Sequence, residues 1–168
     1  ELIAQEGVTF TGGVPTIWTM YLAHLEQTGE TPGVLKRVMI GGSAVPRAMA
    51  EALKTRYGVD TLQIWGMTET APMGVISSPT PALAALGEAE MQEAIWSRQG
   101  RLQFGVELRI VGDDGQALAW DGETPGALQV RGPWVVQRYF RQEQDAAGPD
   151  GWFDTGDVAT IDANGFMR

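Results

Sequence analysis

The chain has 168 residues, a formal net charge of −9 at pH 7 and no cysteine. The missing cysteines exclude disulfides, thiol catalysis and thiolate metal sites. The acidic balance argues against nucleic acid as a partner, because such partners require clustered lysine and arginine. No apolar run approaches the roughly 20 residues that a transmembrane segment needs, and without a signal-like start a cytoplasmic location is the default. The sequence leaves the oligomeric state, including a homodimer, undecided.

The first part of the chain predicts strands that alternate with helices. Residues 7–13 are rich in β-branched and aromatic side chains and end in glycines, as short buried strands do. A helix should begin near Pro15, because apolar residues then repeat at helical spacing. It should stop at Gly29.

A second strand and helix repeat this order. The strand over 34–40 opens into a Gly-Gly-Ser-Ala loop at 41–44, a helix then ends at Gly58, and a third strand covers 62–65. This order predicts a βαβ unit with parallel strands. Ligands of such sheets bind beyond the carboxyl ends of the strands. The loop at 41–44 and the segment after residue 65 should therefore line one crevice.

The segment after the third strand carries the side chains best suited to chemistry. Trp65 offers a flat apolar face for a ring, and Gly66 lets the backbone approach a ligand closely. Thr68 can donate a hydrogen bond to an anionic oxygen, and Glu69 is a hard oxygen ligand suited to Mg²⁺. Together these residues can hold a purine, a phosphate and a metal. A strand end with a capped turn is the competing interpretation, because Thr and Glu are ordinary helix-start residues.

The loop at 41–44 also has two interpretations. It lacks the Gly-Lys-Ser/Thr of a Walker loop and does not match the dinucleotide fingerprint. Taken alone, it is a tight turn between a strand and a helix. Considered together with Trp65, it becomes a candidate wall of a nucleotide pocket.

The second part of the chain has a different pattern. Residues 79–98 form a connector whose helical stretch, 88–98, we expect to pack on its own core. Apolar residues then alternate with polar ones at 106–110 and 128–131, with turns of hairpin type between them. This pattern predicts a small antiparallel sheet or barrel. We expect three aromatic side chains in its core or in the seam between the lobes: Trp134, Tyr139 and Phe140.

A third candidate motif is Phe-Asp-Thr-Gly-Asp at 153–157. A carboxylate placed just after a glycine, as Asp157 is, can accept hydrogen bonds from both hydroxyls of a ribose. Without context, an Asp that caps a turn before a strand over 158–161 is the simpler explanation.

The three motifs stand in a fixed order, with Gly-Gly-Ser-Ala first, Trp-Gly-Met-Thr-Glu-Thr at 65–70 second and Phe-Asp-Thr-Gly-Asp last. In wording and order they resemble the adenylate-forming enzymes, and among these the medium- and long-chain fatty acyl-CoA synthetases. The resemblance implies that a carboxylic (fatty) acid is activated with Mg·ATP to an acyl-adenylate, and that the acyl group then passes to coenzyme A. The alternatives are a ligase for an aryl, short-chain or sulfur-containing acid, and a non-catalytic nucleotide-binding or interaction domain.

The resemblance also implies roles for single residues. The catalytic pair would be Thr68, at the α-phosphate, and Glu69, holding Mg²⁺. Trp65, where Tyr is commoner in the family, would pack on the adenine, and Asp157 would bind the ribose. Further contacts to ATP or AMP are expected at Gly42, Ser43, Ala44, Ile64, Gly66, Met67 and Thr68. The acyl pocket is expected at Gly41, Gly66 and Met67, with Val14 and Trp18 as further candidates.

The expected fold is α/β. Residues 1–98 should form part of the nucleotide- and acyl-binding lobe, with a βαβ-type parallel sheet, and residues 99–168 a small β-rich antiparallel lobe. The chain begins without methionine and ends within an expected strand, so we expect it to be a piece of a longer protein. The resemblance implies that it is part of a larger N-terminal domain. The resemblance places a phosphate loop and a C-terminal catalytic lysine outside these residues. It therefore predicts that the 168 residues alone are inactive.

Overall fold

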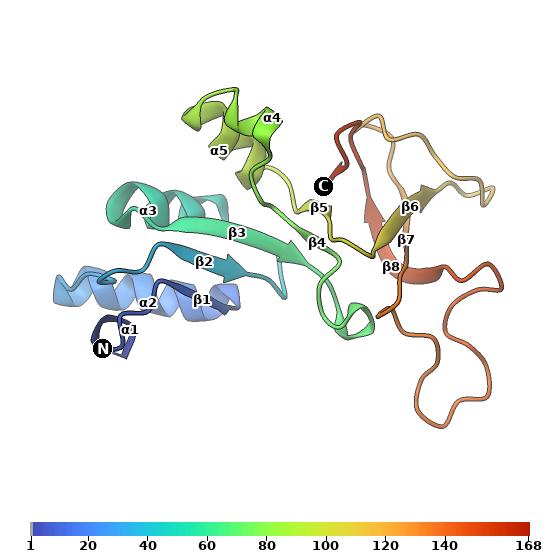
Figure 1. Ribbon diagram of the computed structural model, residues 1–168, viewed down its shortest axis with the longest axis horizontal. Helices are drawn as coiled ribbons and strands as arrows, with labels where there is room; N and C mark the ends of the chain where they lie inside the picture. Colours follow the sequence, from blue (N-terminus) through green and yellow to red (C-terminus); the bar gives the residue numbers. More distant parts are fainter. Residues whose placement is uncertain (1) are drawn as a thin grey trace. The chain divides into compact units, whose positions relative to one another are not determined.

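A computed structural model describes residues 2–168 (Figure 1). They divide into two compact units. The first contains the described residues up to Ile64 together with Ser77–Ser97, and the second contains Trp65–Ile76 together with Arg98–Arg168. The predicted α/β fold, with a parallel sheet and a small antiparallel sheet, is confirmed. The predicted boundary at residue 98 stays a prediction, and the contact pattern groups Trp65–Ile76 with the second unit.

After a short first helix that the sequence did not predict, the first unit is the predicted succession of strands and helices. Its elements are α1 (Leu2–Gln5), β1 (Phe10–Gly13), α2 (Pro15–Thr28), β2 (Arg37–Ile40), α3 (Arg47–Tyr57) and β3 (Asp60–Trp65). The strands pair in parallel in the order β1-β2-β3, and α2 packs against α3. Gly29 and Gly58 end the two helices in the left-handed conformation that glycine adopts without strain. Both helix ends are as predicted.

The core of the first unit lies between this sheet and its helices. Trp18 of α2, Ile40 of β2 and Leu53 of α3 are all at most 3 % exposed. They belong to one apolar cluster with Val38 and Met49. Burial of large side chains from α2, α3 and β2 holds these elements together, because the apolar area removed from water is the main favourable term in folding.

The connector contains two helices, α4 (Pro81–Ala84) and α5 (Glu88–Trp96). Ile95 is the buried residue of α5, so the expected packing on an apolar face is limited. Polar contacts supplement it within the first unit. Arg47 of α3 makes a two-pronged ion pair with Glu93 at 2.7 and 2.5 Å, and the Gln63 amide donates to the Ile95 and Trp96 carbonyls.

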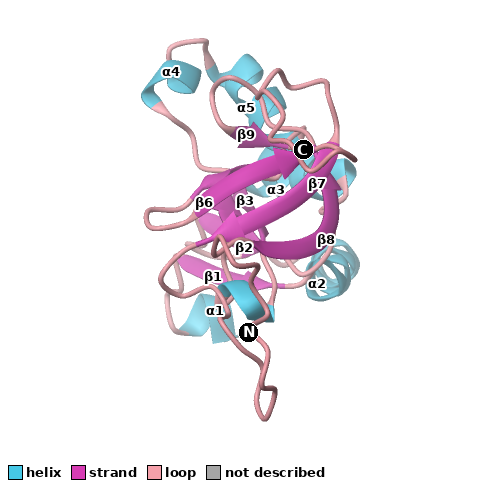
Figure 2. Cartoon of the chain, turned by 90° about the vertical axis from the view of Figure 1, so that its right-hand side faces the viewer, coloured by secondary structure: helices cyan, strands magenta, loops and turns pink. Residues whose placement is uncertain are grey.

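The second unit contains two antiparallel arrangements. In one, β4 (Val75–Ile76), β5 (Gly100–Leu102) and β9 (Phe166–Met167) pair in this order. In the other, β6 (Glu107–Val111), β7 (Gly126–Arg131) and β8 (Phe153–Ala159) form the sheet seen in Figure 2. The predicted alternation is confirmed, because residues 108, 110, 128 and 130 are buried. Within residues 2–168, no helix is long and apolar enough to cross a bilayer.

The expectation that Trp134, Tyr139 and Phe140 lie in the core of this lobe was wrong, and their place in a seam between the lobes stays a prediction. They are 40 %, 47 % and 86 % exposed. They lie on the long loop between β7 and β8, which contributes Val135 to the core instead. The strands of the sheet already supply enough inward-facing aliphatic side chains to fill the space between them.

The strand expected over 158–161 begins earlier than predicted. Strand β8 spans Phe153–Ala159, so Thr155, Gly156 and Asp157 lie inside it and not in a turn before it. The competing interpretation of Asp157 as a turn cap was therefore wrong. Pairing along β7 explains the difference, because Phe153 and Asp154 already bond to β7.

Candidate functional site

The turn after β3 is held together by its own residues. The Thr70 side chain is fully buried, and its Oγ1 accepts a hydrogen bond from the Met67 N–H and donates one to the Met67 carbonyl, each at 3.0 Å. A Cβ at Gly66 would overlap the carbonyl oxygen of Pro72. Thr70 and Gly66 are thus required by the turn itself. The sequence interpretation assigned no such role to Thr70.

The turn presents the two predicted catalytic side chains differently. Thr68 is exposed, whereas Glu69 is partly buried and accepts a 2.8 Å hydrogen bond from the Tyr139 hydroxyl on its Oε1. The Glu69 carbonyl accepts from the Val136 N–H at 2.8 Å. The hydrogen bond to the carboxylate raises the pKa of the Tyr139 phenol above its usual range, because the bond requires the phenol proton. The loop that carries Tyr139 therefore fixes the predicted metal ligand.

The surroundings of Glu69 fit a metal ion that brings other ligands with it. Within residues 2–168, no group of three His, Asp or Glu side chains is placed to hold a metal. Mg²⁺ at nucleotide sites uses one or two carboxylates, and phosphate oxygens and water complete its coordination. Glu69 accepts the Tyr139 hydrogen bond on Oε1, and a carboxylate has a second oxygen, Oε2, that can coordinate such an ion.

Trp65 and Asp157 come from two different motifs and meet directly. The indole Nε1–H of Trp65 donates a 2.8 Å hydrogen bond to Asp157 Oδ2. A Cβ at Gly74 would overlap the Trp65 ring, so the glycine allows the ring to lie against the chain. Both residues belong to the second unit. The structure thus joins the residues predicted to bind adenine and ribose.

The Thr-Gly-Asp sequence is explained by an irregularity in β8. The register between β7 and β8 shifts around Leu128, which leaves 155–157 opposite that residue. Thr155 Oγ1 donates to the Leu128 carbonyl at 2.9 Å and accepts from the Asp157 N–H at 3.1 Å. Gly156 has a φ of 77°, which L side chains rarely adopt. These features leave the Asp157 side chain exposed on a fixed backbone.

The remaining predicted residues belong to the first unit, apart from Gly66 and Met67. Gly41 is buried, and a Cβ there would overlap the Ile64 side chain. The next three residues, Gly42, Ser43 and Ala44, are exposed. Of the weaker candidates, Val14 is 47 % exposed, whereas Trp18 is buried in the first unit's core. That these residues share a site with Trp65 and Asp157 stays a prediction.

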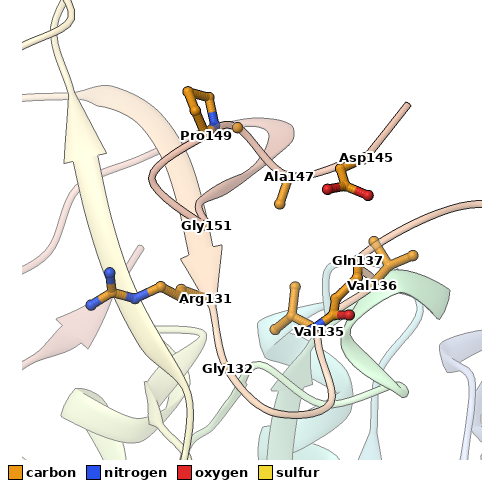
Figure 3. Close-up of a pocket in the computed structure, with 10 residues that line it drawn as sticks. Arg131, Gly132, Val135, Val136, Gln137, Asp145, Ala147, Pro149 and Gly151 are labelled. Atoms are coloured by element: carbon orange, nitrogen blue, oxygen red, sulfur yellow. The ribbon is translucent and has the colours of Figure 1, made fainter. Parts of the chain in front are cut away.

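A pocket of about 450 Å³ in the second unit lies elsewhere (Figure 3). Its lining comes from the end of β7 and the long loop that follows. Its charged groups already have partners: Arg131 pairs with Glu107 at 2.5 Å, and Asp145 pairs with Arg138 at 2.7 Å. Figure 3 shows the Arg131 side chain directed away from Asp145. The lining includes none of the predicted site residues, and we assign the pocket no chemistry.

Comparison with known proteins places this arrangement in a family. Residues 1–140 match the family described as AMP-binding enzyme. The chain is 46 % identical over 167 residues to 3-methylmercaptopropionyl-CoA ligase from Ruegeria lacuscaerulensis, covering 99 % of this chain and 31 % of that protein. It is 43 % identical to the medium-chain-fatty-acid–CoA ligase of Ectopseudomonas oleovorans, covering 99 % and 30 %.

A solved structure with ligands is also similar. The O-succinylbenzoate coenzyme A synthetase of Bacillus subtilis, in complex with ATP and magnesium ion, superposes with a TM-score of 0.76 at 27 % identity. The alignment covers 99 % of this chain and 32 % of that one.

The chain therefore belongs to the AMP-binding enzyme family, and the relatives described above are acyl-CoA ligases. The predicted resemblance to adenylate-forming enzymes is confirmed. The chain spans about a third of the length of the curated relatives that it matches.

Proposed function

We propose that the protein containing this chain is an ATP-dependent acyl-CoA ligase. It would join a carboxylate to the α-phosphate of ATP, releasing pyrophosphate, and then transfer the acyl group to the thiol of coenzyme A with release of AMP. The observation that carries the proposal is the hydrogen bond between Trp65 and Asp157, which brings two nucleotide motifs together in one compact unit. The family match and the ligase relatives support it.

Each side chain has a proposed task. Thr68, exposed beside a rigid turn, donates to the α-phosphate oxygen on which negative charge develops as the carboxylate attacks. Asp157 accepts hydrogen bonds from the ribose, and the Trp65 ring packs on the adenine. The remaining predicted nucleotide contacts are Gly42, Ser43, Ala44, Ile64, Gly66 and Met67.

Glu69 is proposed to hold the magnesium ion of Mg·ATP. The ion, when bound, neutralises phosphate charge and orients the phosphates for attack. The carboxylate is available for this task because its hydrogen-bond partner, Tyr139, is neutral at physiological pH. Mg²⁺ also offsets part of the repulsion between ATP and an acidic chain of net charge −9.

A medium- or long-chain fatty acid is the proposed acid, bound near Gly41, Gly66 and Met67, with Val14 and Trp18 as weaker candidates. A sulfur-containing acid is the second candidate. The relative named 3-methylmercaptopropionyl-CoA ligase is 46 % identical to this chain, and the one named medium-chain-fatty-acid–CoA ligase is 43 % identical, so identity does not separate the two acids. Motifs that bind a shared nucleotide do not separate acids, since acid selectivity depends on the pocket.

The experiment is pyrophosphate release by the full-length protein with Mg·ATP, with and without coenzyme A. The acid panel contains fatty acids of graded length, 3-methylmercaptopropionate and an aryl acid. Acid-dependent pyrophosphate release that yields an acyl-CoA supports the ligase. The acid that gives the fastest release shows which acid the pocket selects. ATP binding without acid-dependent release would instead favour a non-catalytic nucleotide-binding domain. The 168 residues alone are proposed to form no adenylate, because they span only about a third of the ligase relatives.

A further inference from the structure

The hydrogen bond between Trp65 and Asp157 does more than join two motifs. Its donor is the indole Nε1–H and its acceptor is one of the two carboxylate oxygens, Oδ2, at 2.8 Å. The orientation of an aspartate carboxylate is set by two side-chain torsions, χ1 and χ2. A directional bond to one oxygen restricts both torsions, and so it also determines where Oδ1 points.

The donor side of this bond is fixed by the chain around it. The Trp65 carbonyl accepts from the Gly74 N–H at 3.0 Å, and a Cβ at Gly74 would overlap the indole ring. The Trp65 ring also packs on the apolar cluster of the second unit. The indole therefore has little freedom to swing away from Asp157.

The acceptor side is fixed through the backbone. Thr155 bridges the Asp157 N–H and the Leu128 carbonyl, and the register shift in β8 is built around this bridge. The Asp157 side chain itself is exposed. The indole N–H is therefore the contact that restrains the carboxylate of an otherwise solvent-facing residue.

We propose that Trp65 is a positioning residue for Asp157, in addition to any packing on the adenine. By holding Oδ2, the indole keeps Oδ1 and the remaining lone pairs of Oδ2 directed toward the ribose hydroxyls before the nucleotide arrives. Preorganisation of this kind lowers the entropy cost of binding. The inference rests on the proposed function, since it assumes that Asp157 binds the ribose. A positioning role requires the indole N–H, so Phe at this position should not replace Trp, because Phe offers a flat ring without a donor.

The test separates positioning from packing. In the full-length protein, Trp65→Phe keeps a ring for the adenine and removes the N–H. KM is measured for ATP and for 2′,3′-dideoxy-ATP, which lacks the ribose hydroxyls. A lost hydrogen bond to a charged group should raise KM for ATP about 10-fold, with kcat changed less, and should leave KM for the dideoxy analogue within about 2-fold. Trp152→Phe is the matched control, because the Trp152 ring contacts the guanidinium groups of Arg109 and Arg131 in the same unit.

Equal KM changes for both nucleotides, or no change for either, would overturn the inference. Inactivity of the wild-type protein toward every acid would remove the proposed function instead, so a second readout is independent of activity. In Asp157→Ala, one indole N–H resonance should move upfield in the nitrogen-15 spectrum and exchange faster with solvent. If no indole resonance responds, the hydrogen bond does not form in solution and the inference fails. This readout also covers the case in which Trp65→Phe does not fold.

Discussion

Two loops that follow parallel strands are built in different ways. After β2, Gly41 is buried against the Ile64 side chain, and the next three residues, 42–44, are exposed. After β3, the turn over 65–70 is bonded to itself through Thr70, packed against Pro72, and bonded outward to Tyr139 and Asp157. The first loop supplies shape and backbone. The second supplies side chains in fixed positions.

The difference shows that the turn after β3 is held by more contacts than the loop after β2. A wall of a pocket needs only a backbone that approaches closely, which glycine provides. Groups that meet developing charge must be oriented before the reaction, because reorientation during the step raises the barrier. The extra hydrogen bonds of the turn after β3 are consistent with the second task.

The largest expected effect separates two threonines of the same turn. Thr68→Val should lower kcat for acid-dependent pyrophosphate release about 100-fold, because a donor to the reacting phosphate is removed, while stability changes by less than about 0.5 kcal/mol. Thr70→Val should instead destabilise the protein by about 2 kcal/mol, because the buried Thr70 hydroxyl is the partner of the Met67 N–H and one of two donors to the Met67 carbonyl, the other being the Thr70 N–H. Kinetics and thermal unfolding of both variants check this. A stability loss in Thr68→Val matching that of Thr70→Val would contradict the division.

The next effect compares the two glycines. In Gly66→Ala the new methyl group meets the backbone carbonyl of Pro72. In Gly41→Ala it meets mainly the Ile64 side chain, with the Ile64 carbonyl oxygen at 3.0 Å. The carbonyl in the tight turn cannot move aside, whereas Ile64 can shift only against its stiff χ1, so we expect losses of about 3 and about 2 kcal/mol respectively. Unfolding midpoints of the full-length protein measure the order. Equal midpoints would mean that the second loop is no more rigid than the first.

Much of the fold could be predicted from the sequence, because local signals decide it. Helical periodicity and the glycines at 29 and 58 specified α2 and α3, and alternation specified β6 and β7. The exposed aromatics on the loop after β7 were wrongly expected in the core, since no local signal distinguishes a buried aromatic from an exposed one when the strands already fill the core.

The contacts of the site were harder to predict than its residues. Trp65 meets Asp157 and Glu69 meets Tyr139 at separations of 92 and 70 residues, and such contacts depend on how the chain folds back. The role of Thr155 depends on a register shift in β8 that has no local signature. The spacing of Thr68, Glu69 and Thr70 did not show which hydroxyl is buried.

A smaller effect concerns the hydrogen bond from Tyr139 to Glu69. Tyr139→Phe removes the donor that orients the carboxylate. Loss of a partner that orients a metal ligand typically weakens metal binding 10-fold or more, so the Mg²⁺ concentration for half-maximal activity should rise about 10-fold. Tyr57→Phe on α3 is the matched control and should leave the Mg²⁺ requirement unchanged. An unchanged requirement in Tyr139→Phe would show that the bond does not orient Glu69.

The smallest effect is a shift in titration. The Tyr139 phenol has a pKa raised above 10, first because it donates to Glu69. The folded protein thus holds this proton more tightly than the unfolded chain, so the stabilisation is complete below pH 10 and is lost as pH rises through the folded pKa. In Glu69→Gln the acceptor is neutral, and the titration midpoint of Tyr139, followed by carbon-13 NMR, should fall toward 10. Tyr21, whose pKa is raised mainly by burial, provides an internal control because it should not move. A Tyr139 midpoint that stays in place would mean that the hydrogen bond to Glu69 is not formed in solution. The turn after β3 would then keep its internal bonds, its bond to Asp157 and the backbone bond from the Val136 N–H to the Glu69 carbonyl. It would lose its side-chain link to the loop that follows β7.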